Sequence, residues 1–159
     1  MTTVTLPEID FPPGVCHFVA TPIGNMADVS LRALAVLAAA DVVYCEDTRH
    51  TRGLLNRYDL KCYLMSYHDH NKLKAVPQII ERLRAGEKVV VVSDAGMPCI
   101  CDPGFSLSRR LLEEELPFTV IPGPSSTLSA LVLSGFSPDR FLFVGYLPRK
   151  KGKRATFFK

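Results

Sequence analysis

The sequence predicts an α/β fold in which a mostly parallel sheet is flanked by helices. Short apolar segments alternate along the chain with segments of helical character, which is the pattern of strands joined by helices. Residues 89–92 are four consecutive valines, and a strand without hydrophobic alternation is typical of a parallel sheet that is buried on both faces. In the preceding segment, apolar residues recur at i, i+3, i+4 and i+7 from Val76 to Leu83, which indicates an amphipathic helix.

Six strands are expected, each on a short run of apolar or β-branched residues. The run at 89–92 is the clearest and the run at 62–65 is the weakest. In chain order the expected strands are residues 15–20, 42–45, 62–65, 89–92, 118–121 and 141–144.

The first two helices expected between these strands differ in polarity. Ser30 is a suitable N-cap for a helix through Ala40. That helix is apolar on nearly every side, so we expect it to be deeply buried. Its apolar positions include Leu31, Leu34, Val36 and Leu37. A polar helix follows residues 46–50 and continues to about Tyr58.

The later helices are marked by their ends or by their charges. Pro77 lies near the start of the helix with the apolar stripe, and Gly86 lies just past its end. The helix after residues 95–104 has two Arg–Glu pairs, each four residues apart, on its outer face. Ser125 is a suitable cap for a helix ending at Gly135. The two pairs are Arg109 with Glu113 and Arg110 with Glu114.

Length and composition bound the class of protein. A chain of 159 residues, 47% of them hydrophobic, can bury one good core. Its longest apolar stretch, 34–45, contains Asp41 and is shorter than the roughly 20 residues of a membrane helix. The first fifteen residues lack the pattern of a signal peptide. The five cysteines have no C-x-x-C spacing, which predicts reduced thiols in a cytosolic, non-membrane protein rather than disulfides or structural zinc.

Basic residues are concentrated at the C-terminus. Six of the 19 lysines and arginines lie in residues 149–159, which contain no acidic residue, and the rest of the chain has 13 basic and 16 acidic residues. Such a block is typical of a segment that meets a polyanion, and a solvated end is the alternative. The six are Arg149, Lys150, Lys151, Lys153, Arg154 and Lys159.

Four loops follow expected strands and should form the functional edge of the sheet, because ligands of open parallel sheets bind beyond the carboxyl ends of the strands. Glycine in three of them lets a ligand approach the backbone closely. Asp94 directly follows a buried strand, where a carboxylate suits a ribose hydroxyl or a cationic group, and a turn-capping aspartate is the alternative. Neither G-x-G-x-x-G nor a P-loop motif is present. The loops are residues 21–25, 46–50, 94–98 and 122–127.

Seven segments resemble one known family in their order and spacing. The family is the ribosomal RNA small-subunit methyltransferase I group, within the tetrapyrrole-methylase fold, and the similarity covers about residues 15–155. The segments are Val19 to Asn25, Cys45 to Arg52, Ser66 to Asn71, Val92 to Gly96, Ile121 to Ser125, Asp139 to Phe143 and Leu147 to Lys153.

The resemblance implies a homodimeric enzyme that methylates a cytidine 2′-hydroxyl in small-subunit ribosomal RNA. It also implies that the cofactor, S-adenosylmethionine, lies on the loops after the first, fourth and fifth strands. On the matching positions of this chain, the cofactor-binding residues are Ile23, Gly24, Asp94, Ala95, Gly96, Met97, Ser125, Ser126 and Thr127. Two departures touch the cofactor loop: the family usually has threonine where this chain has Met97, and it lacks cysteines at positions like Cys99 and Cys101.

The resemblance also implies a domain plan with a tetrapyrrole-methylase-like N-terminal domain. Residues 1–14 are expected to be an irregular N-terminal arm, residues 15–135 the α/β cofactor-binding domain, and residues 136–159 a linker with the start of a truncated second domain. Within the last segment, Thr156 to Phe158 look like the start of another element. Family members continue for roughly another domain that supplies the other wall of the cleft, and without it the chain alone can be inactive.

A ribose hydroxyl becomes a good nucleophile only when a base takes its proton. The candidate bases are Glu46, Asp47, His50, His68 and His70, and we favour Glu46 or Asp47. Arg49 would then hold a phosphate or pair with a carboxylate. The alternative is structural: Asp47 caps the next helix and Arg49 forms an ion pair. His68-x-His70 permits a metal site, but no third ligand has suitable spacing, so we expect no metal.

The RNA of the small ribosomal subunit is the expected partner, held through phosphate contacts. The residues expected to contact it are Arg52, Arg149, Lys150, Lys151, Lys153 and Arg154, with Arg57 as a further candidate. Two other functions stay open: methylation of a small cyclic tetrapyrrole by the same fold, and a non-catalytic module that dimerises or binds the ribosome. The 21–25 loop, residues 46–52 and the basic tail argue against the tetrapyrrole, and the missing second domain favours the module.

Overall fold

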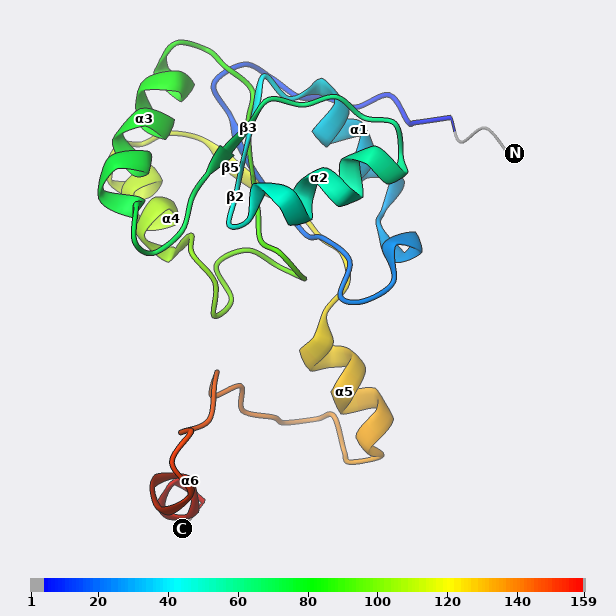
Figure 1. Cartoon of the computed structure of the whole chain (residues 1–159), viewed down its shortest axis with the longest axis vertical. Helices are drawn as coiled ribbons and strands as arrows, with labels where there is room; N and C mark the ends of the chain where they lie inside the picture. The colour runs from blue at the N-terminus through cyan, green and yellow to red at the C-terminus, as the bar shows by residue number, and fades with distance from the viewer. Residues whose placement is uncertain (1–4, 159) are drawn as a thin grey trace. The chain divides into compact units, whose positions relative to one another are not determined.

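The computed structural model describes residues 5–158, and the strands within them form one five-stranded parallel sheet (Figure 1). The order across the sheet is β3-β2-β4-β1-β5, so β4 is inserted between the first two strands of the chain. Every pairing is parallel, with Cys16 opposite Val89 and Phe118. The strands are β1 (Cys16–Val19), β2 (Val42–Cys45), β3 (Leu64–Ser66), β4 (Val89–Val92) and β5 (Phe118–Ile121). The predicted α/β class is therefore confirmed.

The helices cover both faces of this sheet, because each parallel connection must cross back over it. In Figure 1, α1 and α2 lie on one side of the strands and α3 and α4 on the other. The helices in this part of the chain are α1 (Leu31–Ala39), α2 (Thr48–Arg57), α3 (Lys72–Arg84) and α4 (Phe105–Glu113), with a short 3₁₀ turn, η1 (Met26–Asp28).

The two faces hold separate hydrophobic clusters, which explains the run of valines. Val90 and Val92 pack in the cluster that contains α1 and α2, while Val89 and Val91 pack in the cluster that contains α3 and α4. All four valines are buried. The sequence pattern without alternation thus reflects a central strand that is covered on both sides.

The start of α1 confirms one prediction and corrects another. The Ser30 hydroxyl oxygen accepts a hydrogen bond from the Ala33 N–H at 3.1 Å, as an N-cap does. Leu31, expected to be buried, is 49% exposed. The first residue of the helix lies on the side turned away from the sheet, whereas residues 33–37 are buried.

Helix α3 starts earlier than the apolar stripe suggests. It begins at Lys72, so Pro77 is its sixth residue rather than a residue near its first turn. Proline cannot donate a hydrogen bond to the carbonyl four residues before it, here that of Leu73, and sequence reasoning therefore places it at a helix start. Packing of Ala75, Ile79, Ile80 and Leu83 against the sheet stabilises the helix despite this lost bond.

Two predicted strands need correction. The weak strand at 62–65 is shifted to Leu64–Ser66, where it pairs with β2. Residues 141–144 form no strand in the described part of the chain, although their sequence is apolar. A strand forms only where a neighbouring strand accepts its hydrogen bonds, and local composition does not reveal whether such a neighbour exists.

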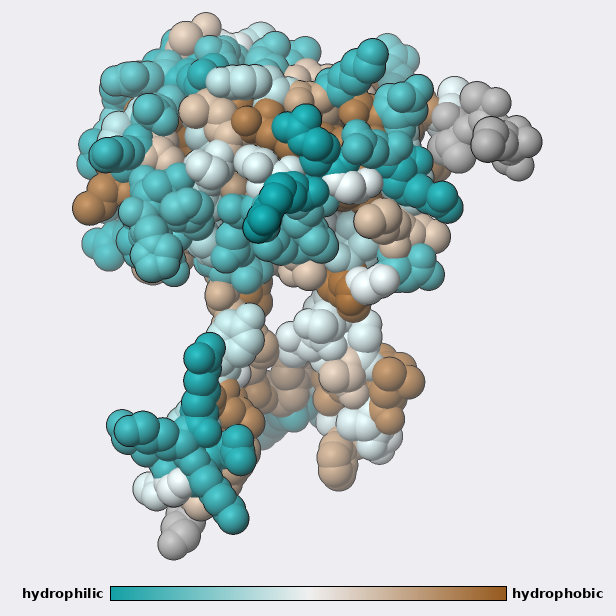
Figure 2. Space-filling view, in the orientation of Figure 1, coloured by the Kyte–Doolittle hydropathy of each residue, from teal (hydrophilic) through white to brown (hydrophobic). Residues whose placement is uncertain are grey.

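The chain separates into two compact units, Met1–Ser125 and Ser126–Lys159. The second unit contains α5 (Ser126–Ser134), as predicted after Ser125, and α6 (Lys151–Phe157), which starts five residues before the expected element at Thr156. None of its described residues is buried, and Val132, Leu133 and Leu142 are among its exposed apolar side chains. Figure 2 shows apolar residues, in brown, at the surface of this unit.

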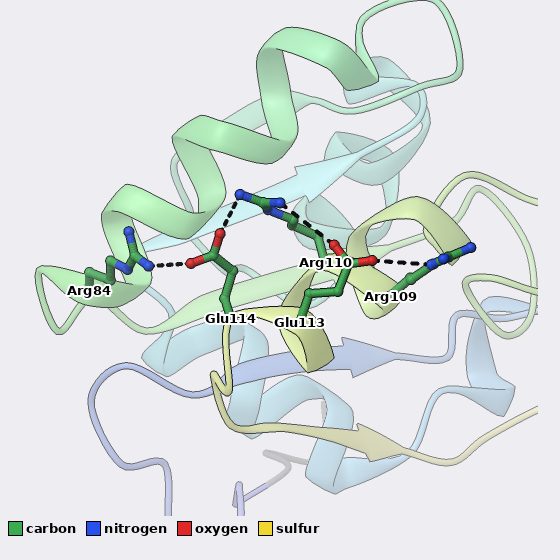
Figure 3. Close-up of polar contacts among 5 residues, drawn as sticks. All are labelled: Arg84, Arg109, Arg110, Glu113 and Glu114. Carbon is green, nitrogen blue, oxygen red and sulfur yellow. Dashed lines mark hydrogen bonds and ion pairs between the residues drawn. The ribbon is translucent and has the colours of Figure 1, made fainter.

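An ion-pair network joins α3 to the end of α4 (Figure 3). Glu114 pairs with Arg84 of α3 and with Arg110 of α4. Glu113 pairs with Arg109, Nε to Oε1, at 3.2 Å, so both predicted i, i+4 pairs are present. The network therefore links the two helices on one face of the sheet as well as stabilising α4 itself.

Candidate functional site

The carboxyl ends of β1 and β4 lie side by side at the point where the chain changes direction across the sheet. The connections after β1 and β2 run toward one edge and place α1 and α2 on one face, whereas those after β3 and β4 run the other way and place α3 and α4 on the opposite face. The chain therefore leaves β1 toward one face of the sheet and leaves the neighbouring β4 toward the other. A crevice at such a switch point is where ligands bind in open α/β sheets.

Backbone and hydroxyl groups join these two loops. Thr21 and Gly96 form an isolated bridge, in which the Thr21 N–H donates to the Gly96 carbonyl at 2.9 Å and the Gly96 N–H donates back at 3.1 Å. The Thr21 hydroxyl donates to the Ser93 carbonyl at 3.1 Å, and the Ser93 hydroxyl donates to the Gly96 carbonyl at 3.2 Å. Thr21 and Ser93 are buried, so these bonds hold the loops in a defined shape.

Asp94 connects the same point to β2. Its Oδ1 accepts the Asp47 N–H at 3.0 Å, across the neighbouring strand ends of β4 and β2. Asp94 lines two pockets. The carboxylate predicted from the sequence as a ligand group is therefore shared by both hollows at this edge of the sheet.

The first hollow, which we call the switch-point pocket, has a volume of about 100 Å³. Its wall is largely apolar apart from Asp94 and the hydroxyls, so it suits a flat or aliphatic part of a ligand. A volume this small lies below the roughly 300 Å³ at which complete ligand pockets begin, so it can hold only part of a larger ligand. The lining residues are Thr21, Pro22, Gly24, Met26, His50, Thr51, Leu54, Ser93 and Asp94.

The second hollow, which we call the acidic pocket, is wider and more polar. It has a volume of about 480 Å³ and opens between the ends of β2, β3 and β4. Three carboxylates line it together with hydroxyl and imidazole groups. The lining residues are Glu46, Asp47, Thr48, Arg49, Ser66, His68, His70 and Asp94.

Glu46 is the carboxylate of this pocket that is best suited to take a proton. Burial raises its pKa above the ordinary value of 4.5, and the charges of Asp94, Asp102 and Asp69 raise it further, while His68 opposes them. Burial likewise raises the pKa of Asp102, with a further contribution from Asp94. Negative charge is therefore concentrated around Glu46, which makes its carboxylate more basic.

Asp47 and Arg49 have the structural roles that the sequence left open as an alternative. The Asp47 side chain caps α2 by accepting the Arg49 N–H at 2.8 Å, and its Oδ2 lies 2.7 Å from the Arg49 guanidinium. These bonds hold the pKa of Asp47 well below its ordinary value. A carboxylate stabilised in this way is a weak base, which favours the structural alternative for Asp47.

The remaining predicted cofactor-binding residues are divided between the two units. Gly24 lines the switch-point pocket, and the half-buried Ile23 approaches Gly96, whose φ of +83° favours glycine. Ala95 is exposed and Met97 is half-buried on the same loop. Ser125 ends the first unit, whereas Ser126 and Thr127 are the first residues of α5 in the second unit, so their part in the site stays a prediction.

The predicted RNA-binding residues are all exposed where they are described. Arg52 lies on α2, and five basic residues lie immediately before or within α6. Lys159, the sixth basic residue of the tail, lies outside the described residues. The five are Arg149, Lys150, Lys151, Lys153 and Arg154.

Sequence reasoning missed several lining residues. His50 was considered as a base but lines the apolar switch-point pocket with Thr51 and Leu54 of α2. Ser66 lines the acidic pocket, and Asp102 adds charge to it from a loop distant in sequence. His50 and Leu54 lie one helical turn apart, so their spacing alone indicates that they share the face of α2 that lines this pocket.

Among residues 5–158 no helix combines the length and apolar character needed to cross a membrane. Within the same range, no three histidine, cysteine, aspartate or glutamate side chains are arranged to hold a metal ion.

A family model and two known relatives match most of this chain. Residues 15–158 match the family model described as Tetrapyrrole (Corrin/Porphyrin) Methylases. The ribosomal RNA small subunit methyltransferase I of Mesorhizobium japonicum is 49% identical over 140 residues, which cover 88% of this chain and 48% of that protein. The protein of the same name from Thermotoga maritima is 45% identical, over 89% of this chain and 64% of that protein. The chain thus spans about half to two thirds of the length of these relatives.

Solved structures agree on the fold. The crystal structure of uroporphyrin-III-C-methyltransferase from Thermus thermophilus matches 80% of this chain and 54% of its own, with a TM-score of 0.60 and 26% identity. A cobalt precorrin-4 methyltransferase matches 76% of this chain and 50% of its own, with a TM-score of 0.58. Its 18% identity makes it evidence for the fold alone.

Proposed function

The chain belongs to the family of tetrapyrrole (corrin/porphyrin) methylases, and on this premise we propose that it is the cofactor-binding part of an S-adenosylmethionine-dependent methyltransferase that acts on small-subunit ribosomal RNA. The substrate follows from the relatives, which are named for that activity and are up to 49% identical to this chain. The finer proposal is that the methyl group is transferred to the 2′-hydroxyl of a cytidine ribose.

One observation carries the proposal: the switch-point pocket and the acidic pocket meet at Asp94. A methyl donor and its acceptor must lie next to each other, because in-line transfer depends on their relative position. Two adjoining hollows that share one carboxylate provide such an arrangement. The sequence of this loop also places a glycine, Gly96, where a side chain would approach Ile23, so the backbone stays accessible.

The residues of the switch-point pocket fit a nucleoside cofactor. The Asp94 carboxylate uses Oδ1 for the Asp47 N–H, and among the described residues Oδ2 has no hydrogen-bond partner. A carboxylate oxygen at this position can accept from a ribose hydroxyl or face a cationic group. The apolar wall made by Pro22, Met26 and Leu54 suits the uncharged parts of the cofactor. S-adenosylmethionine, when bound, supplies an electrophilic methyl group on a sulfonium sulfur.

Within the acidic pocket, Glu46 is the proposed base. Its raised pKa lets the carboxylate accept the proton of a ribose hydroxyl as the oxygen forms its new bond. Asp47 and Arg49 hold the start of α2, and Asp47 is tied to Asp94 through its N–H. Glu46 directly precedes this fixed point, so its backbone is positioned relative to Asp94 before any ligand arrives.

Calorimetric titration of the chain with S-adenosylmethionine tests the cofactor site. We expect saturable binding to the wild type and at least about tenfold weaker binding to Asp94→Asn, which keeps an oxygen for the Asp47 N–H and removes the charge. Asp59→Asn is the matched control, because Asp59 is exposed, lies outside both pockets and has a positive φ that asparagine tolerates. Equal affinity of Asp94→Asn and wild type would contradict the proposed site.

Activity separates this function from methylation of a tetrapyrrole. Methyl transfer from labelled S-adenosylmethionine is measured on small ribosomal subunits and on uroporphyrinogen. Incorporation into ribosomal RNA alone supports the proposal, and incorporation into the porphyrinoid alone would replace it. A folded chain that binds the cofactor and labels neither substrate would favour a non-catalytic module.

A further inference from the structure

His68 has a hydrogen-bonding atom that the fold does not use. Its Nδ1 is buried and has no hydrogen-bond partner among the described residues, although the imidazole lines the acidic pocket. Buried polar atoms are nearly always hydrogen-bonded, so an unpaired one in a residue that lines a pocket suggests a partner that is not part of the chain. The other buried side-chain atom without such a partner, the Tyr44 hydroxyl, lies beside Arg82 and does not line this pocket.

The backbone around His68 is held by Asn71. Asn71 Oδ1 accepts the His68 N–H at 2.9 Å, and Nδ2 donates to the Ser66 carbonyl at 2.9 Å and to the Ser66 hydroxyl at 3.2 Å. Between Ser66 and His68, the buried Tyr67 places its hydroxyl 3.2 Å from Ser106 Oγ on α4. The loop is therefore anchored at three successive residues, and Ser66 and His68 are set against the pocket.

The other polar side chains of this loop form an ion pair or are exposed. Asp69 pairs with Lys72 at 3.0 Å on the outside of the loop. His70 is exposed, with its ring centroid 5.9 Å from that of His68. His68 also interacts electrostatically with Glu46, whose pKa it lowers against the effect of the surrounding carboxylates. The imidazole and the proposed base thus belong to one group of interacting side chains.

The charge of the pocket indicates which part of a nucleotide it can take. Glu46, Asp47 and Asp94 disfavour a phosphate, and the guanidinium of Arg49 is already paired with Asp47. A hydroxyl group is suited to this surrounding because it donates one hydrogen bond and accepts others. It could therefore bond to a carboxylate and to an imidazole nitrogen at the same time.

On the basis of the proposed function, we propose that His68 binds the acceptor nucleotide by a hydrogen bond between Nδ1 and the ribose 2′-hydroxyl, with Asn71 as the residue that positions it. Such a contact discriminates RNA from DNA at the site of modification, because only RNA carries that hydroxyl. His68 would then contribute to specificity, beside the proposed base Glu46.

The test compares a short oligocytidine with its 2′-deoxy counterpart on the whole chain. We expect the wild type to bind the RNA about tenfold more tightly than the DNA, and His68→Gln to lose most of this preference, the rest being due to the Glu46 carboxylate. His68→Asn should retain most of the preference, because its amide nitrogen can take the place of Nδ1 whereas that of glutamine lies further out. Asn71→Ala should weaken the preference, and Lys74→Gln, exposed on α3 and outside the pocket, should leave it unchanged.

Nitrogen-15 NMR of the imidazole provides the second measurement. The His68 resonances, assigned by their loss in His68→Gln, should shift on saturation with the RNA oligomer and not with the DNA oligomer. An RNA preference that is undiminished in His68→Gln, or His68 resonances that do not move, would overturn the contact. If the chain in that case still binds S-adenosylmethionine, the proposed function stands without the His68 contact. If the His68 effects occur in a chain that binds no cofactor, the contact stands and the cofactor proposal fails.

Discussion

At the scale of single residues, two neighbouring carboxylates differ because their surroundings differ. Glu46 is half-buried among other acids, which raises its pKa, whereas Asp47 accepts hydrogen bonds from Arg49, which lower its pKa. The sequence favoured both equally, since adjacent acidic residues after a strand give no indication of their partners. The environment in the fold separates the proposed base from the helix cap.

The raised pKa of Glu46 predicts how pH changes stability. The folded state binds the Glu46 proton more tightly than the unfolded chain, so ionisation of this group destabilises the fold as the pH rises above about 4.5. Glu46→Gln removes this cost and should raise the melting temperature by about 1–3 °C at neutral pH. The difference should vanish at about pH 3.5, where both residues are neutral. Exposed Glu81→Gln serves as the control, and a Glu46→Gln variant less stable than wild type at neutral pH would contradict the expectation.

Two glycines should respond in opposite ways to alanine. A Cβ on Gly104 would overlap Cys99 Sγ at a φ of +142°, so Gly104→Ala should destabilise the chain by about 2 kcal/mol or more. Gly53 lies in α2, and a Cβ there would meet only Met26 Cε at an ordinary 3.9 Å. Gly53→Ala should therefore stabilise by about 0.5–1 kcal/mol. Urea denaturation measures both, and effects of the same sign would disagree with the structure.

At the scale of elements, the carboxylate of Glu114 joins two helices. Its side chain is 16% exposed and pairs with Arg84 and Arg110, whereas Glu113 is 50% exposed. Glu114→Gln should lower the free energy of unfolding by about 1 kcal/mol, and Glu113→Gln by less than about 0.5 kcal/mol. Denaturation at low and high salt provides the check, because screening should reduce both losses. Equal losses in the two variants would mean that the link between α3 and α4 adds nothing.

At the scale of the whole molecule, the basic tail and the proposed RNA site belong to different units. Five described basic residues at 149–154 lie in the second unit, and the proposed RNA site lies in the first. Replacing all five with glutamine should weaken RNA binding and reduce the slope of log affinity against log salt by up to about 3.5, since each single-strand phosphate contact contributes about 0.7. The same measurement on a variant with Arg32, Lys61 and Lys74 replaced is the control. An unchanged salt slope would exclude the tail from RNA binding.

The sequence by itself determined the α/β class, β1, β2, β4 and β5 of the sheet, and three of the loops that line the two pockets, those after β1, β2 and β4. These features depend on local patterns: the consecutive valines of β4, the cap at Ser30 and the carboxylate Asp94 directly after a strand. Residues next to one another in the chain set them, so they can be read without knowing the fold.

Only the tertiary structure decided what depends on neighbours far apart in the sequence. It inserted β4 between β1 and β2, brought Asp94 to the Asp47 N–H, and left residues 141–144 without the strand that their composition predicts. It also assigned Asp47 to the helix cap and placed His68 in the lining of the acidic pocket. Pairing, burial and electrostatic coupling arise from contacts between distant segments, and the local pattern of residues does not contain them.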